Sequence, residues 1–299
     1  MIVVIVGPTG VGKTALSIAL AKHYQTELIS GDSIQIYREL NIGSAKVTPK
    51  EQEGVKHHMI DIVDPDASYS VALFQRDVRK HIDDMYQRNQ LPMIVGGTGF
   101  YIRSVLHDYT FHGDDSKTEF EKSCESLSNE ALYQRLSLVD LKSTEKIHPN
   151  NRKRLIQALY RAQGSVPMSE KLDGDKKLYD YVIIGLTTKR TTLYERIDQR
   201  VEQMFKDGLV EEVKQLFDKG VQGQSIQAIG YKELYQHFNH ELSLDEAKAL
   251  IKKNTRRYAK RQYTFFNNQF EVKWLDVNFS DFEETITQAI AHIDQRKHQ

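Results

Sequence analysis

Short hydrophobic runs alternate with amphipathic stretches along much of the chain. The runs are typical of parallel strands that are buried on both faces of a sheet. There are four of them: Ile2–Val6, Glu27–Ser30, Met93–Val95 and Tyr181–Leu186. The stretches Lys13–His23 and Val71–Arg88 lie between them, and the second carries apolar residues at the three- and four-residue spacing of a helix. This alternation predicts an α/β fold in which helices flank a parallel sheet.

The middle of the chain differs from both ends. From about Thr110 to Leu178 the sequence is polar, with helical patterns at Asn129–Leu138 and Arg152–Arg161 and no convincing strand. We therefore expect a catalytic core of residues 1–109 and 180–299, interrupted by a helical insertion at residues 110–179. The C-terminal third is predicted to contain helices at Thr191–Phe205, Leu209–Lys219, Gln227–Phe238 and Leu244–Phe266, a strand at Val272–Leu275 and a last helix from about Phe282.

Composition narrows the class of protein. The chain has 299 residues, of which 39% are hydrophobic and 27% charged, and its formal net charge is zero. No apolar run approaches the roughly 20 residues that cross a bilayer, and the first residues are typical of a core strand, not of a signal peptide. Cys124 is the single cysteine, which excludes an internal disulfide and a multi-cysteine zinc site. We expect a cytoplasmic enzyme without membrane contact.

A glycine-rich loop follows the first predicted strand and leads into the first predicted helix. It has the G-x-x-x-x-G-K-[ST] pattern and consists of Gly7, Pro8, Thr9, Gly10, Val11, Gly12, Lys13 and Thr14. Backbone N–H groups at such a helix start bind phosphates, Lys13 adds a positive charge, and the Thr14 hydroxyl can hold Mg²⁺. A chance glycine turn does not explain why the lysine and the threonine stand together. The loop alone leaves kinases, GTPases, motor ATPases and group transferases open.

The ends of two other strands carry further chemistry. Asp32 follows the second strand, where it could be a metal ligand, a general base or a turn cap. The third strand ends in Gly96, Gly97 and Thr98, where glycines permit close approach of a ligand and Thr98 offers a hydroxyl. The sequence contains no Asn-Lys-x-Asp motif, which argues against a GTPase.

Positive charge is concentrated in two segments. Residues 252–261 contain six Lys or Arg and no carboxylate, and Asn150–Arg161 is basic in the same way. On charge alone, each segment fits a nucleic-acid contact and a solvated helix face equally well.

Several motifs in order resemble the bacterial tRNA dimethylallyltransferases, a family of isopentenyl transferases. They are GPTGVGKT at 7–14, GDSIQIYRELNIGSAK at 31–46, HHMIDIVDPDASYS at 57–70, GGTGFYI at 96–102, IHPNNRKR at 147–154, the helix from Arg196 to Arg200, IQAIGYKEL at 226–234 and TRRYAKRQ at 255–262. Only the first is a general motif, but the ordered set covers nearly the whole chain. The resemblance implies a P-loop NTPase-like parallel sheet with a helical insertion subdomain.

The same resemblance implies a reaction and its residues. A dimethylallyl group would pass from dimethylallyl diphosphate to the exocyclic amine of the adenosine 3′-adjacent to the anticodon, with release of diphosphate. The glycine loop and Arg200 would bind the diphosphate, with Lys13 acting in catalysis and Mg²⁺ on Thr14. Asp32 would be the general base, and Thr98 would hydrogen-bond at the reacting centre.

The resemblance also implies contacts to tRNA. Asp32, Ser33, Ile34, Gln35 and Thr98 would surround the flipped adenine. The anticodon stem-loop would be contacted by Lys153, Arg154, Leu155, Ile156 and Gln157. Gln157 stands where an arginine is frequent in the family, and the stretch around Phe111–Glu121 is short for the family's insertion. With tRNA as partner, both basic segments are expected to be RNA contacts, and we expect a monomer.

Two alternatives remain from the residues alone: a P-loop kinase of a nucleoside or small metabolite, and a nucleotide-gated RNA-binding module. Minor features are interpreted as structural. His57-His58 lacks further ligands for a metal, and Cys124 lies in a polar stretch without a catalytic partner. The aromatic residues Tyr258, Tyr263, Phe265 and Phe266 are expected to pack in the core.

Overall fold

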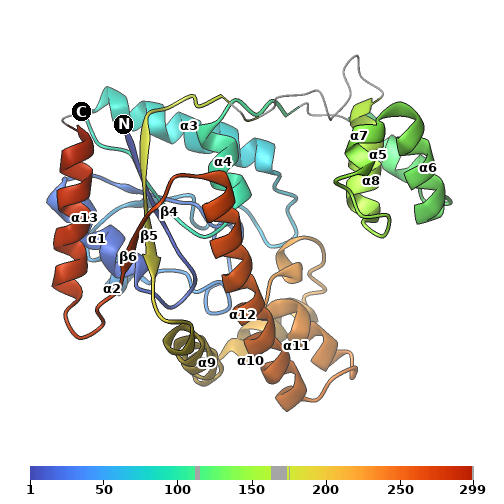
Figure 1. The fold of residues 1–299 in the computed structure, drawn as a ribbon. Coiled ribbons are helices and arrows are strands. Elements are labelled where there is room, and N and C mark those ends of the chain that lie inside the picture. The colour runs from blue at the N-terminus through green and yellow to red at the C-terminus, as the bar shows by residue number, and fades with distance from the viewer. Residues whose placement is uncertain (112–114, 163–173, 175, 298–299) are drawn as a thin grey trace. The chain divides into compact units, whose positions relative to one another are not determined.

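The computed structural model describes residues 1–111, 115–162, 174 and 176–297 (Figure 1). They form two compact units. The core unit comprises Met1–His107 and Lys177–Gln299, and the insertion unit comprises Asp108–Lys176. The boundaries expected from the sequence, at 109/110 and 179/180, lie two and three residues from these positions.

Six strands form one parallel sheet in the core unit, in the order β3-β2-β4-β1-β5-β6. Their bounds are β1 Ile2–Val6, β2 Leu28–Ser30, β3 His57–His58, β4 Met93–Val95, β5 Tyr181–Thr187 and β6 Lys273–Asp276. The predicted α/β class and parallel sheet are confirmed. Strand β3 was not predicted, because two histidines form no hydrophobic run; they join the sheet by pairing with Leu28 and Ile29 at its edge.

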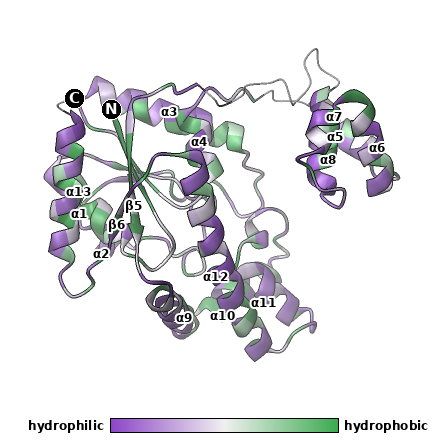
Figure 2. Ribbon diagram, in the orientation of Figure 1, coloured by the Kyte–Doolittle hydropathy of each residue, from purple (hydrophilic) through white to green (hydrophobic). Residues whose placement is uncertain are grey.

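Helices cover both faces of this sheet. Because strand residues alternate between faces, Ile2, Val4 and Val6 pack with α3 (Val71–Gln87) and α4 (Gly99–Leu106). Val3 and Ile5 pack on the other face with α1 (Lys13–His23) and α13 (Phe282–Lys297). Figure 2 shows the central strand β5 as largely hydrophobic, as expected for a strand covered on both faces.

The remaining helices of the core unit lie in the connections after β2 and β5. They are α2 Pro49–Gln52, α9 Arg190–Lys206, α10 Leu209–Asp218, the 3₁₀ turn η1 Ser225–Gln227, α11 Tyr231–Phe238 and α12 Leu244–Gln269. The helix predicted at Gln227–Phe238 was too long. Gln227 is the last residue of the 3₁₀ turn η1, and α11 begins only after Gly230. The N–H of Gly230 donates to Glu233 Oε2 (2.8 Å).

The insertion unit is helical in its described part, with α5 (Asp115–Ser123), α6 (Asn129–Val139), α7 (Leu141–Thr144) and α8 (Arg152–Ala162). Its own hydrophobic core contains Leu132, Leu136, Leu155, Ala158 and Cys124. The cysteine is therefore a core residue of this unit. Part of the segment 111–121, which the sequence analysis expected to be short, lies outside the described residues.

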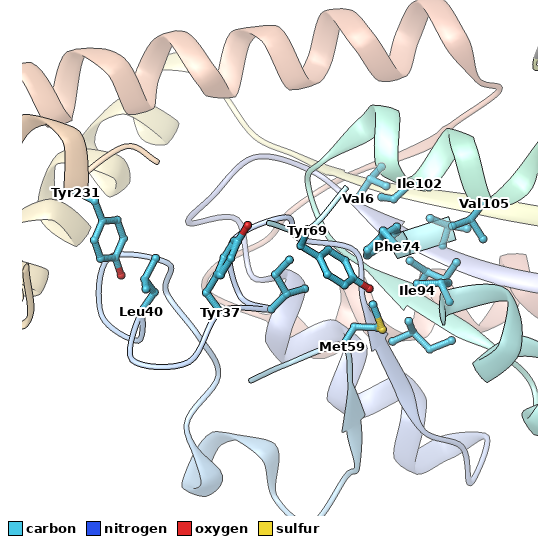
Figure 3. Close-up of a cluster of buried hydrophobic side chains, with 14 of the residues drawn as sticks. Val6, Tyr37, Leu40, Met59, Tyr69, Phe74, Ile94, Ile102, Val105 and Tyr231 are labelled. Carbon is cyan, nitrogen blue, oxygen red and sulfur yellow. The ribbon is translucent and has the colours of Figure 1, made fainter. Parts of the chain in front are cut away.

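A hydrophobic extension of the sheet core supports the segment that follows β2 (Figure 3). Ile36, Tyr37 and Leu40 are buried there, and Leu40 and Tyr231 belong to the same cluster. The Glu212 carboxylate of α10 accepts hydrogen bonds from the N–H groups of Asn41 (2.9 Å), Ile42 (2.8 Å) and Gly43 (3.1 Å). It also accepts one from the Tyr231 hydroxyl (2.7 Å). This carboxylate therefore fixes the far end of the loop that begins at Asp32.

Candidate active site

The predicted site residues that follow strands of the core unit lie at one edge of the sheet. The glycine loop follows β1, Asp32 follows β2, and Thr98 follows β4, and these three strands are neighbours. The loops after β2 and β4 touch, since a Cβ on Gly96 would lie 2.4 Å from the carbonyl carbon of Gly31. Only glycine permits this approach. The carboxyl edge of a parallel sheet is where ligands bind in such folds.

The glycine loop has the backbone of a phosphate site. Gly7 has φ 140°, and a Cβ there would lie 2.7 Å from the Leu186 carbonyl oxygen, so no other residue fits. Helix α1 begins at Lys13, directly after the loop, and has no acidic residue in its first turn. The positive end of the helix dipole therefore faces the loop without a competing carboxylate.

Two cations lie close together beside this loop. The Lys13 ammonium donates to the Pro8 carbonyl oxygen (2.8 Å). Burial and the neighbouring Arg200 lower the pKa of Lys13 to about 8, and Asp32 opposes the shift. Burial also lowers the pKa of Arg200, which is half-buried on α9. Within the described part of the chain neither forms an ion pair, so the pair is suited to a multiply charged anion.

Arg196 supports the loop from behind, a role that the sequence did not reveal. Its Nε donates to the Gly10 carbonyl oxygen (2.7 Å), and its guanidinium lies 3.9 Å from the centroid of the Phe279 ring. Arg196 and Arg200 are four residues apart on α9 and so share a helix face. This four-residue spacing is the sequence feature that could have drawn attention to Arg196.

One carboxylate oxygen of Asp32 stabilises a turn, and the other is available for a substrate. Its Oδ1 accepts from the N–H of Ile34 (2.8 Å) and of Gln35 (3.4 Å), which makes it a turn cap. Its Oδ2 has no hydrogen-bond partner among the described residues. Burial raises the pKa of Asp32 despite these bonds and the nearby Lys13. A half-buried carboxylate with one available oxygen is well placed to accept a proton.

Thr98 lies beside Asp32 at the start of α4. Its Oγ1 accepts from the Ser33 N–H (3.2 Å) and donates to Ser33 Oγ (3.3 Å). The Tyr258 side chain of α12 lies close to Thr98 and Gln262. Burial, with a contribution from Asp32, raises the pKa of Tyr258 to about 12. Tyr258 is not a member of either sheet core, so the prediction that it packs in the core is not confirmed. Tyr263, Phe265 and Phe266 do pack against the two sheet cores.

The other residues that were expected to contact tRNA differ in burial and in their hydrogen-bond partners. Gln35 is occupied internally: its Oε1 accepts from Ser30 Oγ (2.9 Å), and its Nε2 donates to the Ala45 carbonyl oxygen (3.2 Å). Ile34 packs partly against the core. In the insertion unit, Lys153 and Arg154 are exposed and Ile156 and Gln157 are half-buried. Leu155 is fully buried, so its side chain is a core residue of that unit and offers no surface to RNA.

A Mg²⁺ site fits the loop. The Thr14 side chain is exposed at the loop and has no hydrogen-bond partner in the described part of the chain. No group of three His, Cys, Asp or Glu side chains suited to a metal exists among those residues. Mg²⁺ commonly uses one or two protein oxygens and completes its shell with phosphate oxygens and water. Thr14 therefore fits as the protein ligand of a diphosphate-bound Mg²⁺.

Comparison with models of known protein families shows the family to which this chain belongs. The family model described as IPP transferase matches residues 35–269, and one described as Isopentenyl transferase matches residues 1–64. The chain belongs to the IPP transferase family. The resemblance seen in the motifs is thereby confirmed.

Curated relatives and solved structures agree with this membership. A tRNA dimethylallyltransferase of Bacillus cytotoxicus is 52% identical over 293 residues, which cover 95% of this chain and 92% of the relative. One of Anoxybacillus flavithermus is 47% identical, covering 99% and 97%. The tRNA isopentenylpyrophosphate transferase structure of Staphylococcus epidermidis superposes with a TM-score of 0.75 at 41% identity and 99% coverage of both chains. A eukaryotic dimethylallyltransferase solved acting on tRNA gives a TM-score of 0.83 at 27% identity, covering 97% of this chain and 77% of that one.

The structure also bears on membrane contact. Among the residues that it describes, no helix of this IPP transferase family member combines the length and the hydrophobicity that a membrane crossing requires.

Proposed function

We propose that this chain transfers a dimethylallyl group from dimethylallyl diphosphate to the exocyclic amine of the adenosine beside the tRNA anticodon, with release of diphosphate. The names of its curated relatives support the dimethylallyl transfer and the tRNA acceptor. The observation that supports the chemistry is the placement of Lys13 and Arg200 near Asp32, two cations that form no ion pair with any described residue.

The cations act on the leaving group. As the bond between C1 and the diphosphate oxygen breaks, positive charge develops on the allylic carbon and negative charge on the diphosphate. Lys13, Arg200 and the loop N–H groups are fixed before the reaction, so they stabilise the developing charge without reorganising. Mg²⁺, when bound, neutralises part of the same charge. Arg196 holds the loop in position through Gly10.

Asp32 acts on the acceptor. The adenine amine is a poor nucleophile because its lone pair is delocalised into the ring, and it must lose a proton as the new C–N bond forms. Oδ2 of Asp32 takes that proton, while Oδ1 stays bound to the turn. A raised pKa makes the carboxylate a stronger base, provided that it is ionised at the working pH.

The acceptor base must leave its stack to reach Asp32. Enzymes that modify a base bind it flipped out and hydrogen-bond its edge. Thr98 and Ser33 offer hydroxyls beside Asp32, and the Tyr258 hydroxyl adds a third polar group. In the insertion unit, the exposed Lys153 and Arg154, with the half-buried Ile156 and Gln157, are the proposed contacts to the anticodon stem-loop.

Nucleoside mass spectrometry tests the proposal. Unmodified tRNA is incubated with dimethylallyl diphosphate, Mg²⁺ and either the wild type or Asp32→Asn. We expect one added five-carbon unit on adenosine with the wild type only. Absence of that product with the wild type would contradict the proposal, and ATP consumption with a small acceptor and no RNA would favour a kinase. The monomeric state and the cytoplasmic location stay predictions; light scattering checks the first.

A further inference from the structure

Helix α10 presents one carboxylate to the loop that follows β2. The two oxygens of Glu212 accept from four donors: the N–H groups of Asn41, Ile42 and Gly43 and the hydroxyl of Tyr231. In the described part of the chain, no cation forms an ion pair with Glu212. Hydrogen bonds to a charged acceptor are stronger than those between neutral groups. The carboxylate therefore holds the backbone of this loop firmly without a counter-ion.

The tyrosine of α11 reinforces the contact. Tyr231 is fully buried, and its side chain points toward the loop that carries Leu40 (Figure 3). A Cβ on Gly43 would lie 2.5 Å from the Tyr231 ring, so the ring packs directly against the loop backbone. Burial and the neighbouring Glu212 raise the pKa of Tyr231 far above its usual range. The hydroxyl therefore keeps its proton and remains a donor to the carboxylate.

The loop behaves as one folded piece because a buried lysine ties its parts together. The Lys46 ammonium donates to the Tyr37 carbonyl oxygen (2.8 Å), to Asn41 Oδ1 (2.8 Å) and to Asp61 Oδ1 (2.6 Å). The Lys46 N–H also donates to the Asn41 carbonyl oxygen (2.9 Å). The residues held by Glu212 are thus fixed to the middle of the loop as well.

Gln35 connects this end of the loop to Asp32. Its side-chain Nε2 donates to the carbonyl oxygens of Ser44 (3.3 Å) and Ala45 (3.2 Å), which directly follow the residues bound by Glu212. Its backbone N–H donates to Asp32 Oδ1 (3.4 Å). The hydroxyl of Ser30, at the end of β2, donates to its Oε1 (2.9 Å) and so fixes the orientation of the amide. A short series of hydrogen bonds therefore leads from Glu212 to Asp32.

We propose that Glu212 is a positioning residue for the transfer reaction: by holding the N–H groups of residues 41–43, it keeps the Asp32 carboxylate oriented to take the proton of the adenine amine. Glu212 is not among the residues proposed to contact either substrate, so it acts through Gln35 and the turn at Asp32. The inference rests on the proposed function and adds a distant residue on which its rate depends.

Helix α10 also provides a matched control. The test variant is Glu212→Gln, which keeps the size of the side chain but replaces one acceptor oxygen by an NH₂ group that faces other donors. Glu211 is the neighbouring carboxylate in the first turn of the same helix, and it is exposed. Glu211→Gln therefore removes the same charge from the same helix end and controls for the helix dipole. Circular dichroism and thermal melting establish whether each variant is folded.

Two quantities separate positioning from a general structural defect. They are the single-turnover rate at saturating tRNA and donor, and the donor concentration at half-maximal rate. We expect Glu212→Gln to lower the rate by about 10- to 100-fold, since a displacement of about 1 Å at a reacting group costs about 10²-fold. The donor concentration should not change, because the glycine loop and Arg200 lie outside the loop that Glu212 holds. Glu211→Gln should match the wild type in both.

Hydrogen exchange measured by mass spectrometry reports on the loop without the reaction. The N–H groups of residues 41–43 should exchange at least about tenfold faster in Glu212→Gln than in the wild type or in Glu211→Gln. If Glu212→Gln does not fold, Tyr231→Phe makes a smaller change at the same contact. It removes one of the four donors and keeps the ring, and we expect a rate loss of about three- to tenfold with the donor concentration unchanged.

A folded Glu212→Gln protein that transfers at the wild-type rate would overturn the inference. A loss confined to donor binding would do the same, and so would an equal rate loss in Glu211→Gln. In each of these cases the wild type still makes prenylated adenosine, so the proposed function stands while the inference fails. A wild type that makes no prenylated adenosine would instead overturn the proposed function, and the inference with it.

Discussion

Two carboxylates stand at opposite ends of strand β2, and their surroundings have opposite effects. Glu27 precedes the strand, and its oxygens accept from Arg88 (2.8 and 2.9 Å) and from His58 Nε2 (2.6 Å). The hydrogen bonds from Arg88, the largest cause, lower the pKa of Glu27 to about 2. Asp32 follows the strand, and burial raises its pKa. The same chemical group is thus stabilised as an anion at one end and made basic at the other.

The two ends of β2 differ in whether the charged groups around the carboxylate have hydrogen-bond and ion-pair partners within the protein. Around Glu27, cations and carboxylate neutralise one another, and Lys56 adds a longer contact (3.8 Å). Around Asp32, one carboxylate oxygen and the cations Lys13 and Arg200 keep capacity for a partner from outside. Complete networks hold a fold together, whereas incomplete ones cost stability and mark functional sites.

Removing the base should have the largest effect. Asp32→Asn keeps the turn hydrogen bonds through its amide oxygen but cannot take a proton. We expect turnover to fall by about 10²–10⁴-fold, the usual contribution of a general base, with tRNA affinity nearly unchanged. Single-turnover rates and anisotropy measure the two quantities. Glu27→Gln is the matched control at the other end of β2, and a similar rate loss there would erase the distinction between the two ends.

Removing a cation from the diphosphate site should come next. Arg200→Gln is expected to lower kcat/KM for dimethylallyl diphosphate by about 10²-fold, comparable to the loss of one preorganised donor to a developing anion. Arg190→Gln on the same helix is the control, since Arg190 is exposed and bonded to the Tyr194 hydroxyl (3.0 Å). Steady-state kinetics with varied donor measures both. Equal losses in the two variants would show that the helix, and not the charge at the site, is responsible.

The pH profile should separate the two groups of the site. The reaction needs ionised Asp32, so the rate rises with pH through its raised pKa. Donor binding needs protonated Lys13, so kcat/KM falls above about pH 8, by about tenfold per pH unit. Bound diphosphate favours the charged lysine, so kcat itself should fall less. Lys13→Arg should remove the alkaline limb, and a wild-type profile that stays flat to pH 9.5 would contradict this assignment.

The smallest effect should come from Glu27 itself, and on stability only. Glu27→Gln is expected to lower the free energy of unfolding at pH 7 by about 1–2 kcal/mol, because it breaks charged hydrogen bonds. Since the folded pKa is depressed, the stabilisation is present above about pH 4.5 and is lost as the pH falls toward 2. Urea unfolding at pH 7 and pH 3 measures this. A difference that grows on acidification would be the opposite of what the hydrogen bonds require.

Local patterns were enough to predict most of the sheet and the segments that lie at its carboxyl edge. The strand–loop–helix at Gly7–Thr14 and the strand ends at Asp32 and Thr98 depend on short segments, and each segment determines its own structure. Features that depend on distant contacts were missed. Strand β3 exists because β2 offers an edge, and Tyr258 reaches Thr98 only because α12 packs beside α4. The four-residue spacing places Arg196 on the same helix face as Arg200, but it does not identify Gly10 as its partner.

Helix α9 contacts both the glycine loop and helix α12. Arg196 bonds to the glycine loop and Arg200 lies near Lys13, whereas Asp198 and Glu202, offset by two residues, form ion pairs with α12. A shift of α9 would therefore move the glycine loop and helix α12 together. Under the proposed function, an engineer who repacks α9 to admit a longer prenyl chain should expect the acceptor side of the site to change too, because α12 bonds to Gly97 beside Thr98.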